Sequence, residues 1–401
     1  MKETIVLAFS GGLDTSFCVP YLKETRGCDV VTVTVDTGGL DDAARHALDT
    51  RARELGAKDH ILVDARRAFF DETLRWLVAG NVLRGNAYPL CVGAERSLQA
   101  RVSAEQARQL GAKAVAHGCT AAGNDQVRFE VALRVLAPEL EVVAPIRDLG
   151  WSRDQETSWL TERGFVASAD RAAYSINRGL WGCTIGGRET LDTVASIPES
   201  AWVLTRGAFD QPKPPVVHKI TFESGTPVAI DGKKLDPVLL IETLDALAAP
   251  YGIGRGIHLG DTILGLKGRV AFEAPAALVL IAAHRELEKL VLTQKQQRMK
   301  EVLASFYGDQ VHEGQWLEPA CRDVEAFFAS TQARVTGDVM MTFRVGSMWI
   351  DGVSSPWSLR AASKAVYGEA AGEWTSEDAR GFSRMLALPG MLHKRANGAE
   401  A

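Results

Sequence analysis

The sequence predicts an α/β protein whose N-terminal half is a parallel sheet covered by helices on both faces. From residue 1 to about 145, short apolar runs typical of strands alternate with amphipathic runs typical of helices. The spacing of the first two apolar runs suits a right-handed crossover through one helix. The chain has 401 residues, more than one ordinary core holds, so we also expect a second domain.

The elements of the first half follow one another as strand and helix. The expected strands are residues 4–9, 29–36, 59–63 and 114–118, and the expected helices are residues 15–24, 66–77 and 125–135. Ligands of parallel sheets bind at the carboxyl ends of the strands. The loops at residues 11–12, 36–39 and 117–120 each follow a strand, so we expect them to line one crevice.

The second half mixes hairpins and helices and predicts an α+β domain. Its expected elements are a connector at 195–215, a hairpin of 217–222 and 228–230 with Asp231-Gly232 as its turn, helices at 236–248, 275–292 and 294–306, and strands at 332–344 and 348–353. One more amphipathic helix is expected at 376–386, before a polar end. The predicted domains are residues 1–168 and 169–370, followed by a helical arm at 371–401.

Composition excludes several classes of protein. The chain is 46% hydrophobic and 24% charged, with a net charge of -5 that is mixed along its length, so we expect no nucleic-acid partner. No apolar run is long enough to span a bilayer, and residues 1–3 leave no room for a signal peptide. The six cysteines form no CxxC pair, which argues against a disulfide framework and a zinc site. We therefore expect a cytoplasmic protein without a protein-built metal site.

The most informative motif is the run from Ala8 to Ser16, which reads AFSGGLDTS. Gly11 and Gly12 let backbone N–H groups approach an anion, and the helix that follows directs its positive end at the same place. Ser10, Thr15 and Ser16 add hydroxyl donors. A Gly-Gly tight turn is the structural alternative, but the strand before the motif and the helix after it favour a phosphate-binding loop. The run lacks the lysine of a Walker A motif, which disfavours transfer of a γ-phosphoryl group.

A second polar motif, residues 117–130, follows the strand at 114–118. Thr120 and Asn124 can hold a carboxylate, Asp125 can accept from an ammonium group, and Arg128 can bind a second carboxylate or a phosphate. The structural alternative is a solvated helix N-terminus with Asn124 as its cap.

Together the two motifs resemble the argininosuccinate synthase family of the ATP pyrophosphatase superfamily, in which the first motif is the PP-loop. The resemblance covers nearly the whole chain. It continues through Tyr88-Pro89-Leu90, residues 144–147, Tyr174-Ser175-Ile176, Leu180-Trp181-Gly182, residues 252–255, residues 265–269 and residues 272–275. It implies a Rossmann-like N-terminal domain with the PP-loop, a synthetase and multimerisation domain, a C-terminal helix and a homotetramer. The implied reaction joins citrulline and aspartate to argininosuccinate through a citrullyl-adenylate. It uses ATP with Mg²⁺ and releases AMP and pyrophosphate for arginine biosynthesis.

The resemblance assigns roles only to residues that match the family's motifs. ATP binding is implied for Ala8, Phe9, Ser10, Gly11, Gly12, Leu13, Asp14, Thr15, Ser16, Val35 and Gly118. Aspartate binding is implied for Thr120, Asn124 and Asp125, and citrulline binding for Tyr88, Asn124, Arg128, Ser175 and Thr184. The residues expected to act in catalysis are Ser10, Asp14, Asn124 and Arg128.

The sequence also departs from the family pattern. Gly93 stands where the family commonly has a hydroxyl, and Ala122 replaces a lysine. Gly260 aligns with the glutamate beside the citrulline α-amino group, and Phe272 aligns with a nearby tyrosine, while Asp261 can replace that glutamate after a one-residue shift. The acceptor is therefore citrulline or a different ureido compound such as an N-acylcitrulline. A catalytically silent nucleotide-binding homologue is the alternative of another class, and the missing cysteine pairs argue against a tRNA thiolase.

Overall fold

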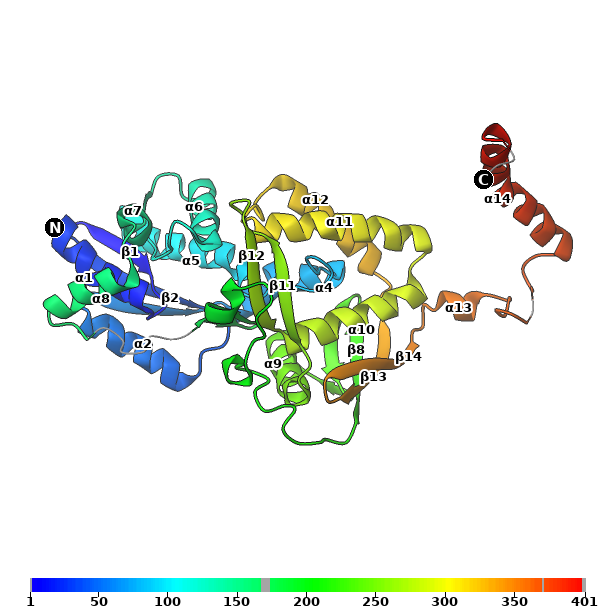
Figure 1. Cartoon of the computed structure of the whole chain (residues 1–401), viewed down its shortest axis with the longest axis horizontal. Helices are drawn as coiled ribbons and strands as arrows, with labels where there is room; N and C mark the ends of the chain where they lie inside the picture. Colours follow the sequence, from blue (N-terminus) through cyan, green and yellow to red (C-terminus); the bar gives the residue numbers. More distant parts are fainter. Residues whose placement is uncertain (1, 167–173, 370, 399–401) are drawn as a thin grey trace.

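The first domain is built on a parallel sheet. The computed structural model describes residues 2–166, 174–369 and 371–398, and Figure 1 shows this sheet at one end of the molecule. Its strand order is β3-β2-β1-β4-β5, and every neighbouring pair runs parallel. The bounds are β1 Thr4–Ala8, β2 Asp29–Asp36, β3 Asp59–Asp64, β4 Ala114–Ala116 and β5 Glu141–Val143. The predicted parallel sheet is confirmed.

Helices cover both faces of this sheet, as the buried side chains of β1 show. Ile5 and Leu7 pack with Phe17 in one apolar cluster, whereas Val6 packs with Ala104 and Phe129 in another. Successive side chains of a strand point to opposite faces, so the clusters lie on the two sides of the sheet. The helices are α1 Leu13–Arg26, α2 Asp42–Glu54, α5 Arg96–Gln109, α6 Asn124–Leu136, α7 Pro145–Leu149 and α8 Arg153–Glu162.

The helix expected at 66–77 is divided. It consists of α3 (Arg66–Phe69), a π-helical turn (Phe70–Leu74) and α4 (Arg75–Gly80). Phe69, Leu74 and Leu77 are fully buried in the apolar core of the second domain. This segment therefore anchors the first domain to the second.

The second domain contains two antiparallel sheets, with strand orders β10-β9-β8-β13-β14 and β11-β12-β7-β6. The strands are β6 Ser175–Gly179, β7 Gly182–Gly186, β8 Val216–Glu223, β9 Thr226–Ile230, β10 Lys233–Lys234, β11 Arg255–Asp261, β12 Lys267–Glu273, β13 Gly337–Arg344 and β14 Ser347–Ser354. The helices are α9 Pro237–Ala248, α10 Pro275–Val291, α11 Gln294–His312, α12 Pro319–Gln332 and α13 Leu359–Ala362. The largest apolar cluster joins α9, α10, α11 and α12 to these strands. None of the helices in the described part of the chain has the length and apolarity that a bilayer crossing requires.

Two sequence-based expectations for this domain were wrong. The turn between β8 and β9 is formed by Ser224 and Gly225, and Asp231-Gly232 instead turns the chain from β9 into β10. Gln332 ends α12 and does not begin a strand, because its buried amide donates to Glu288 at 2.6 Å.

The C-terminal helix is longer than the sequence predicts. It runs as α14 from Ser376 to Ala396, past the expected end at 386, and all of its residues are exposed. Figure 1 shows α14 standing apart from the second domain, at the end of the molecule opposite the parallel sheet. The expected domain boundaries at 168–169 and 370–371 fall on or beside residues outside the described part.

Candidate active site

A cleft of about 1010 Å³ opens at the carboxyl ends of β1, β2 and β4, and residues of the second domain close its far side. Most of the residues proposed from the sequence line this cleft. They are Ala8, Phe9, Ser10, Gly12, Leu13, Asp14, Thr15, Val35, Tyr88, Gly118, Thr120, Asn124, Asp125, Arg128, Ser175, Thr184, Gly260 and Asp261. Gly11, Ser16 and Phe272 do not line it.

The loop between β1 and α1 is shaped to hold an anion. Gly11 has a φ of +74°, a conformation that favours glycine. Gly12 is the N-cap residue before α1 and has no side chain to cap the helix, so the first N–H groups of the helix remain available. The hydroxyls of Ser10 and Thr15 lie 3.2 Å apart beside these groups. Ser16 has a supporting position instead, because its hydroxyl donates to the Gly11 carbonyl at 3.3 Å.

Asp14 is the acidic group of this loop. Its Oδ1 is buried and has no hydrogen-bond partner among the described residues, and Arg153 lies 4.0 Å away. Burial raises the pKa of Asp14, and Arg153 opposes that rise. Behind it lies Glu156 of α8, which is 1% exposed. Burial, and next the charge of Asp14, raise the pKa of Glu156 to about 7. A carboxylate oxygen without a partner beside a phosphate loop fits Mg²⁺, which prefers carboxylate and phosphate oxygens.

The described residues alone do not form a complete cation site. No group of three or more His, Cys, Asp or Glu side chains is arranged there as metal ligands. A magnesium ion at Asp14 would therefore take most of its ligands from the nucleotide and water.

Asp125 is held between two guanidinium groups. Arg128 Nη1 donates to Asp125 Oδ1 at 2.7 Å, and Arg96 Nε donates to Asp125 Oδ2 at 3.0 Å. Burial would raise the pKa of Asp125, but the charges of Arg96 and Arg128 outweigh it and lower the pKa to about 2. The carboxylate stays ionised, and each oxygen keeps a lone pair for an ammonium group of a substrate.

Asn124 does not cap its helix, which corrects the structural alternative drawn from the sequence. Gly123 occupies the cap position, and Asn124 is the first helical residue. Its Oδ1 accepts from the backbone N–H of Ile263 at 2.9 Å. Because Ile263 lies between β11 and β12, Asn124 links the first domain to the second at the cleft.

Tyr88, a residue of the first domain, packs against the wall formed by the second domain. Its ring stacks on His258 with centroids 5.5 Å apart, and Phe272 packs behind it at 5.2 Å. Phe272 is 1% exposed and therefore belongs to the core beneath this wall. This buried position does not support a direct contact between Phe272 and a substrate.

Gly260 and Asp261 lie at the end of β11 on the same wall. The His258 ring fills the space next to Gly260, since a Cβ there would come within 2.6 Å of His258 Nε2. Asp261 pairs with Lys267 at 2.6 Å, and its side chain is 56% exposed. Among the residues that the structure describes, no free carboxylate therefore takes the place expected for a glutamate at Gly260.

Three further candidates supply hydroxyls to the rim. Thr120 is exposed in the loop before α6, and Ser175 is exposed at the start of β6. Thr184 is partly buried on β7, where it pairs with Phe272 and Asn177 of the neighbouring strands. Hydroxyl groups from both domains thus line the same cleft as Arg96 and Arg128.

Sequence reasoning missed several polar residues of the cleft, among them Arg84, Glu95, Arg96, His258 and His312. Glu95 is 2% exposed, and the Thr37 hydroxyl donates to its Oε2 at 2.6 Å. Burial raises the pKa of Glu95 to about 7, against the opposing charge of Arg96. Glu95 and Arg96 could have been found from the sequence, because these two adjacent charged residues follow closely after Tyr88-Pro89-Leu90, which was already a candidate segment.

Glu95 should make the stability of the protein depend on pH. Between its ordinary pKa of 4.5 and about 7, the folded chain keeps a proton that the unfolded chain loses, so stability falls as pH rises. Over that pH range the free energy of unfolding should fall by about 3 kcal/mol. Glu95→Gln should remove it, so the melting temperature of the wild type should fall relative to the variant between pH 5 and 7.5. Glu105→Gln on α5, the helix that begins directly after Glu95, is the matched control, and equal behaviour of both variants would contradict the prediction.

Comparisons with known proteins agree with this architecture. The family model described as arginosuccinate synthase N-terminal HUP domain matches residues 4–166, and the arginosuccinate synthase C-terminal domain matches residues 174–393. The argininosuccinate synthase of Xanthomonas campestris pv. campestris is 42% identical over 403 residues, covering 99% of each chain. Those of Methanocaldococcus jannaschii and Dictyoglomus turgidum are each 37% identical, and the alignments cover 98% and 100% of this chain and of the relatives. The chain therefore belongs to the argininosuccinate synthase family.

Proposed function

We propose that this protein is an ATP-dependent carbon–nitrogen ligase that condenses citrulline with aspartate to argininosuccinate, releasing AMP and pyrophosphate. The observation that carries the proposal is one cleft with a phosphate-binding loop on one wall and the Asn124–Arg128 element beside it. Membership of the family gives the same reaction. We also propose the division at 1–168, 169–370 and 371–401, and a cytoplasmic location, which suits six free cysteines.

The reaction proceeds in two displacements. The ureido oxygen of citrulline attacks the α-phosphorus of ATP, and the bond from that phosphorus to pyrophosphate breaks. The aspartate amine, having lost a proton, then attacks the ureido carbon of the citrullyl-adenylate, and the carbon–oxygen bond to AMP breaks. Neither displacement needs a protein nucleophile, so the enzyme acts by holding the reactants together and stabilising negative charge.

Each wall of the cleft has a role in this scheme. The loop with Ser10 and the N-terminus of α1 would hold the departing phosphates, and Asp14 would hold Mg²⁺ bound with the nucleotide. That ion would neutralise phosphate charge. Arg128 and Asn124 would orient citrulline, and Asp125 would accept from the aspartate ammonium group.

The wall of the cleft around Gly260 leaves open a second possible acceptor substrate. Within the part of the chain that the structure describes, no free carboxylate faces the cleft at Gly260, because Asp261 pairs with Lys267 at 2.6 Å. A substrate ammonium group left without an anionic partner there would lose affinity. This observation favours an N-acylcitrulline as the alternative acceptor for the same chemistry.

The test is to incubate purified protein with Mg²⁺-ATP, aspartate and either citrulline or N-acetylcitrulline, and to measure AMP, pyrophosphate and product by mass spectrometry. Citrulline-dependent AMP with argininosuccinate is the expected result. If AMP forms only with N-acetylcitrulline, the acceptor substrate is an N-acylcitrulline and not citrulline. AMP with neither would leave the silent nucleotide-binding homologue as the better hypothesis.

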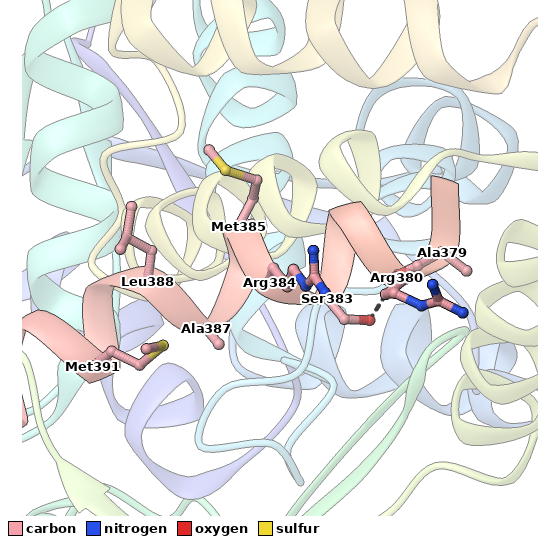
Figure 2. A pocket seen from close by; sticks show the side chains of 8 residues that line it. All are labelled: Ala379, Arg380, Ser383, Arg384, Met385, Ala387, Leu388 and Met391. Carbon is pink, nitrogen blue, oxygen red and sulfur yellow. Dashed lines mark hydrogen bonds between the residues drawn. The ribbon is translucent and has the colours of Figure 1, made fainter. Parts of the chain in front are cut away.

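We propose in addition that α14 packs against other copies of this chain in a homotetramer. Its exposed apolar side chains include Phe382, Met385, Leu386 and Leu392, each more than half exposed. Figure 2 shows a hollow lined by residues of α14 alone, with Met385, Leu388 and Met391 among them. An amphipathic helix with its apolar side uncovered favours a partner on that side.

Removing the arm should change the assembly. A chain that ends at residue 369 should elute as a smaller species than the full chain in size exclusion with light scattering. Phe382→Ser with Met385→Ser should have the same effect, while Glu377→Gln on the same helix should not. An unchanged tetramer after truncation would show that other surfaces hold it together.

A further inference from the structure

The guanidinium of Arg128 is bound on one edge by a single residue of the second domain. Arg128 Nε donates to the backbone carbonyl of His312 at 2.8 Å, and Arg128 Nη2 lies 3.2 Å from His312 Nδ1. His312 is the last residue of α11 and is 7% exposed. Its two acceptors match the parallel N–H bonds on that edge of a guanidinium.

This contact fixes the protonation state of the imidazole. Arginine N–H groups only donate, so His312 Nδ1 must carry a lone pair and the ring proton must be on Nε2. Burial, and next the charge of Arg128, lower the pKa of His312 to about 3. The charges of Arg84 and His258 lower its pKa further, and an interaction with the Asp261 backbone opposes the fall. The ring therefore remains an uncharged acceptor at neutral pH.

The surroundings leave Arg128 little freedom to turn. A Cβ at Gly314 would lie 2.9 Å from Arg128 Cα, and a Cβ at Gly93 would lie 3.2 Å from Arg128 Nη2. The turn after α11 thus packs directly on the arginine backbone, and Gly93 approaches the guanidinium. Of the five N–H bonds, His312 takes two and Asp125 takes one, which leaves two for a ligand in the cleft.

We propose that His312 is a positioning residue that orients the Arg128 guanidinium toward the acceptor substrate by accepting a hydrogen bond at Nδ1. The inference rests on the proposed function, because it takes Arg128 to bind the ureido acceptor. It goes beyond that function in assigning a role to a residue of the second domain. The two domains then contribute jointly to one binding group.

Two substitutions separate this role from mere packing. His312→Leu keeps the volume but removes the acceptor, and His312→Asn keeps an acceptor oxygen near the place of Nδ1. Because the lost hydrogen bond involves a charged group, the leucine variant should raise the KM for the acceptor substrate by about tenfold or more. The asparagine variant should stay within about threefold of the wild type, and the KM for ATP should change little in both.

The measurements use the full-length protein, Mg²⁺-ATP, aspartate and whichever of citrulline and N-acetylcitrulline supports AMP release. Crystal structures of both variants should show the guanidinium in place with asparagine and displaced with leucine. Equal acceptor KM values in the two variants, or a parallel rise in the KM for ATP, would overturn the inference. Wild-type protein that releases no AMP would instead refute the proposed function, and the position of Arg128 in the two crystal structures would then decide the inference.

Discussion

Arg128→Ala should lower kcat/KM for citrulline by about a hundredfold to a thousandfold. Arg128 keeps two N–H groups for the acceptor substrate, two hydrogen bonds to a charged group together contribute about 3 kcal/mol or more, and a tenfold change corresponds to about 1.4 kcal/mol. Arg128 is 6% exposed and binds Asp125 at 2.7 Å. Its loss removes the substrate's cationic partner and leaves Asp125 with Arg96 alone. Steady-state kinetics at saturating ATP and aspartate measure the effect.

Arg134→Ala is the matched control for this prediction. Arg134 lies on the same helix, α6, and its side chain is 74% exposed and paired with Glu130. An exposed pair of this kind contributes little to stability, so the control should keep its activity and melting temperature. If Arg128→Ala retained full turnover with the same KM for citrulline, the assignment of Arg128 to the acceptor site would be wrong.

The phosphate-binding end of the cleft could be predicted from the sequence because its determinants are local. A strand, Gly11-Gly12 and the first turn of α1 are contiguous, and the chemistry of the loop depends on backbone groups that these residues expose. The parallel sheet followed for a similar reason. The four expected strands, β1 to β4, each carry an apolar run followed by a turn and a helix, a pattern readable without knowing the partners, whereas the short β5 was not expected.

The opposite wall could not be predicted in the same way. His258 and His312 are separated by more than fifty residues in sequence and meet at Tyr88 and Arg128 only because β11 and α11 pack against the first domain. No local periodicity marks either histidine. Glu95 was missed because a charged residue after an apolar segment suggests a solvated position, whereas the absence of a side chain at Gly179 leaves room for its carboxylate.

Asp14→Asn should lower turnover by at least about a hundredfold while leaving the melting temperature unchanged or higher. The amide keeps the size of the side chain but loses the charge that a magnesium ion with nucleotide requires, and metal-assisted charge stabilisation supplies several kcal/mol to such reactions. In the substrate-free protein, however, the Asp14 carboxylate lowers the stability of the fold. Its Oδ1 is buried without a hydrogen-bond partner among the described residues, Arg153 lies 4.0 Å away, and burial raises the pKa of the carboxyl more than Arg153 lowers it.

The opposite directions of the two effects make this prediction specific. Substituting a residue that served only the fold would lower the stability of the protein. Substituting a group that is kept for function at the expense of stability should raise it. Asp42→Asn on α2 is the control, since its side chain is 98% exposed and pairs with Arg45 at 3.0 Å. Turnover by product formation and melting temperature by differential scanning fluorimetry should be measured on all three proteins. A variant at Asp14 that melts several degrees lower and keeps its activity would place this carboxylate in the scaffold, and the ion would then need another protein ligand.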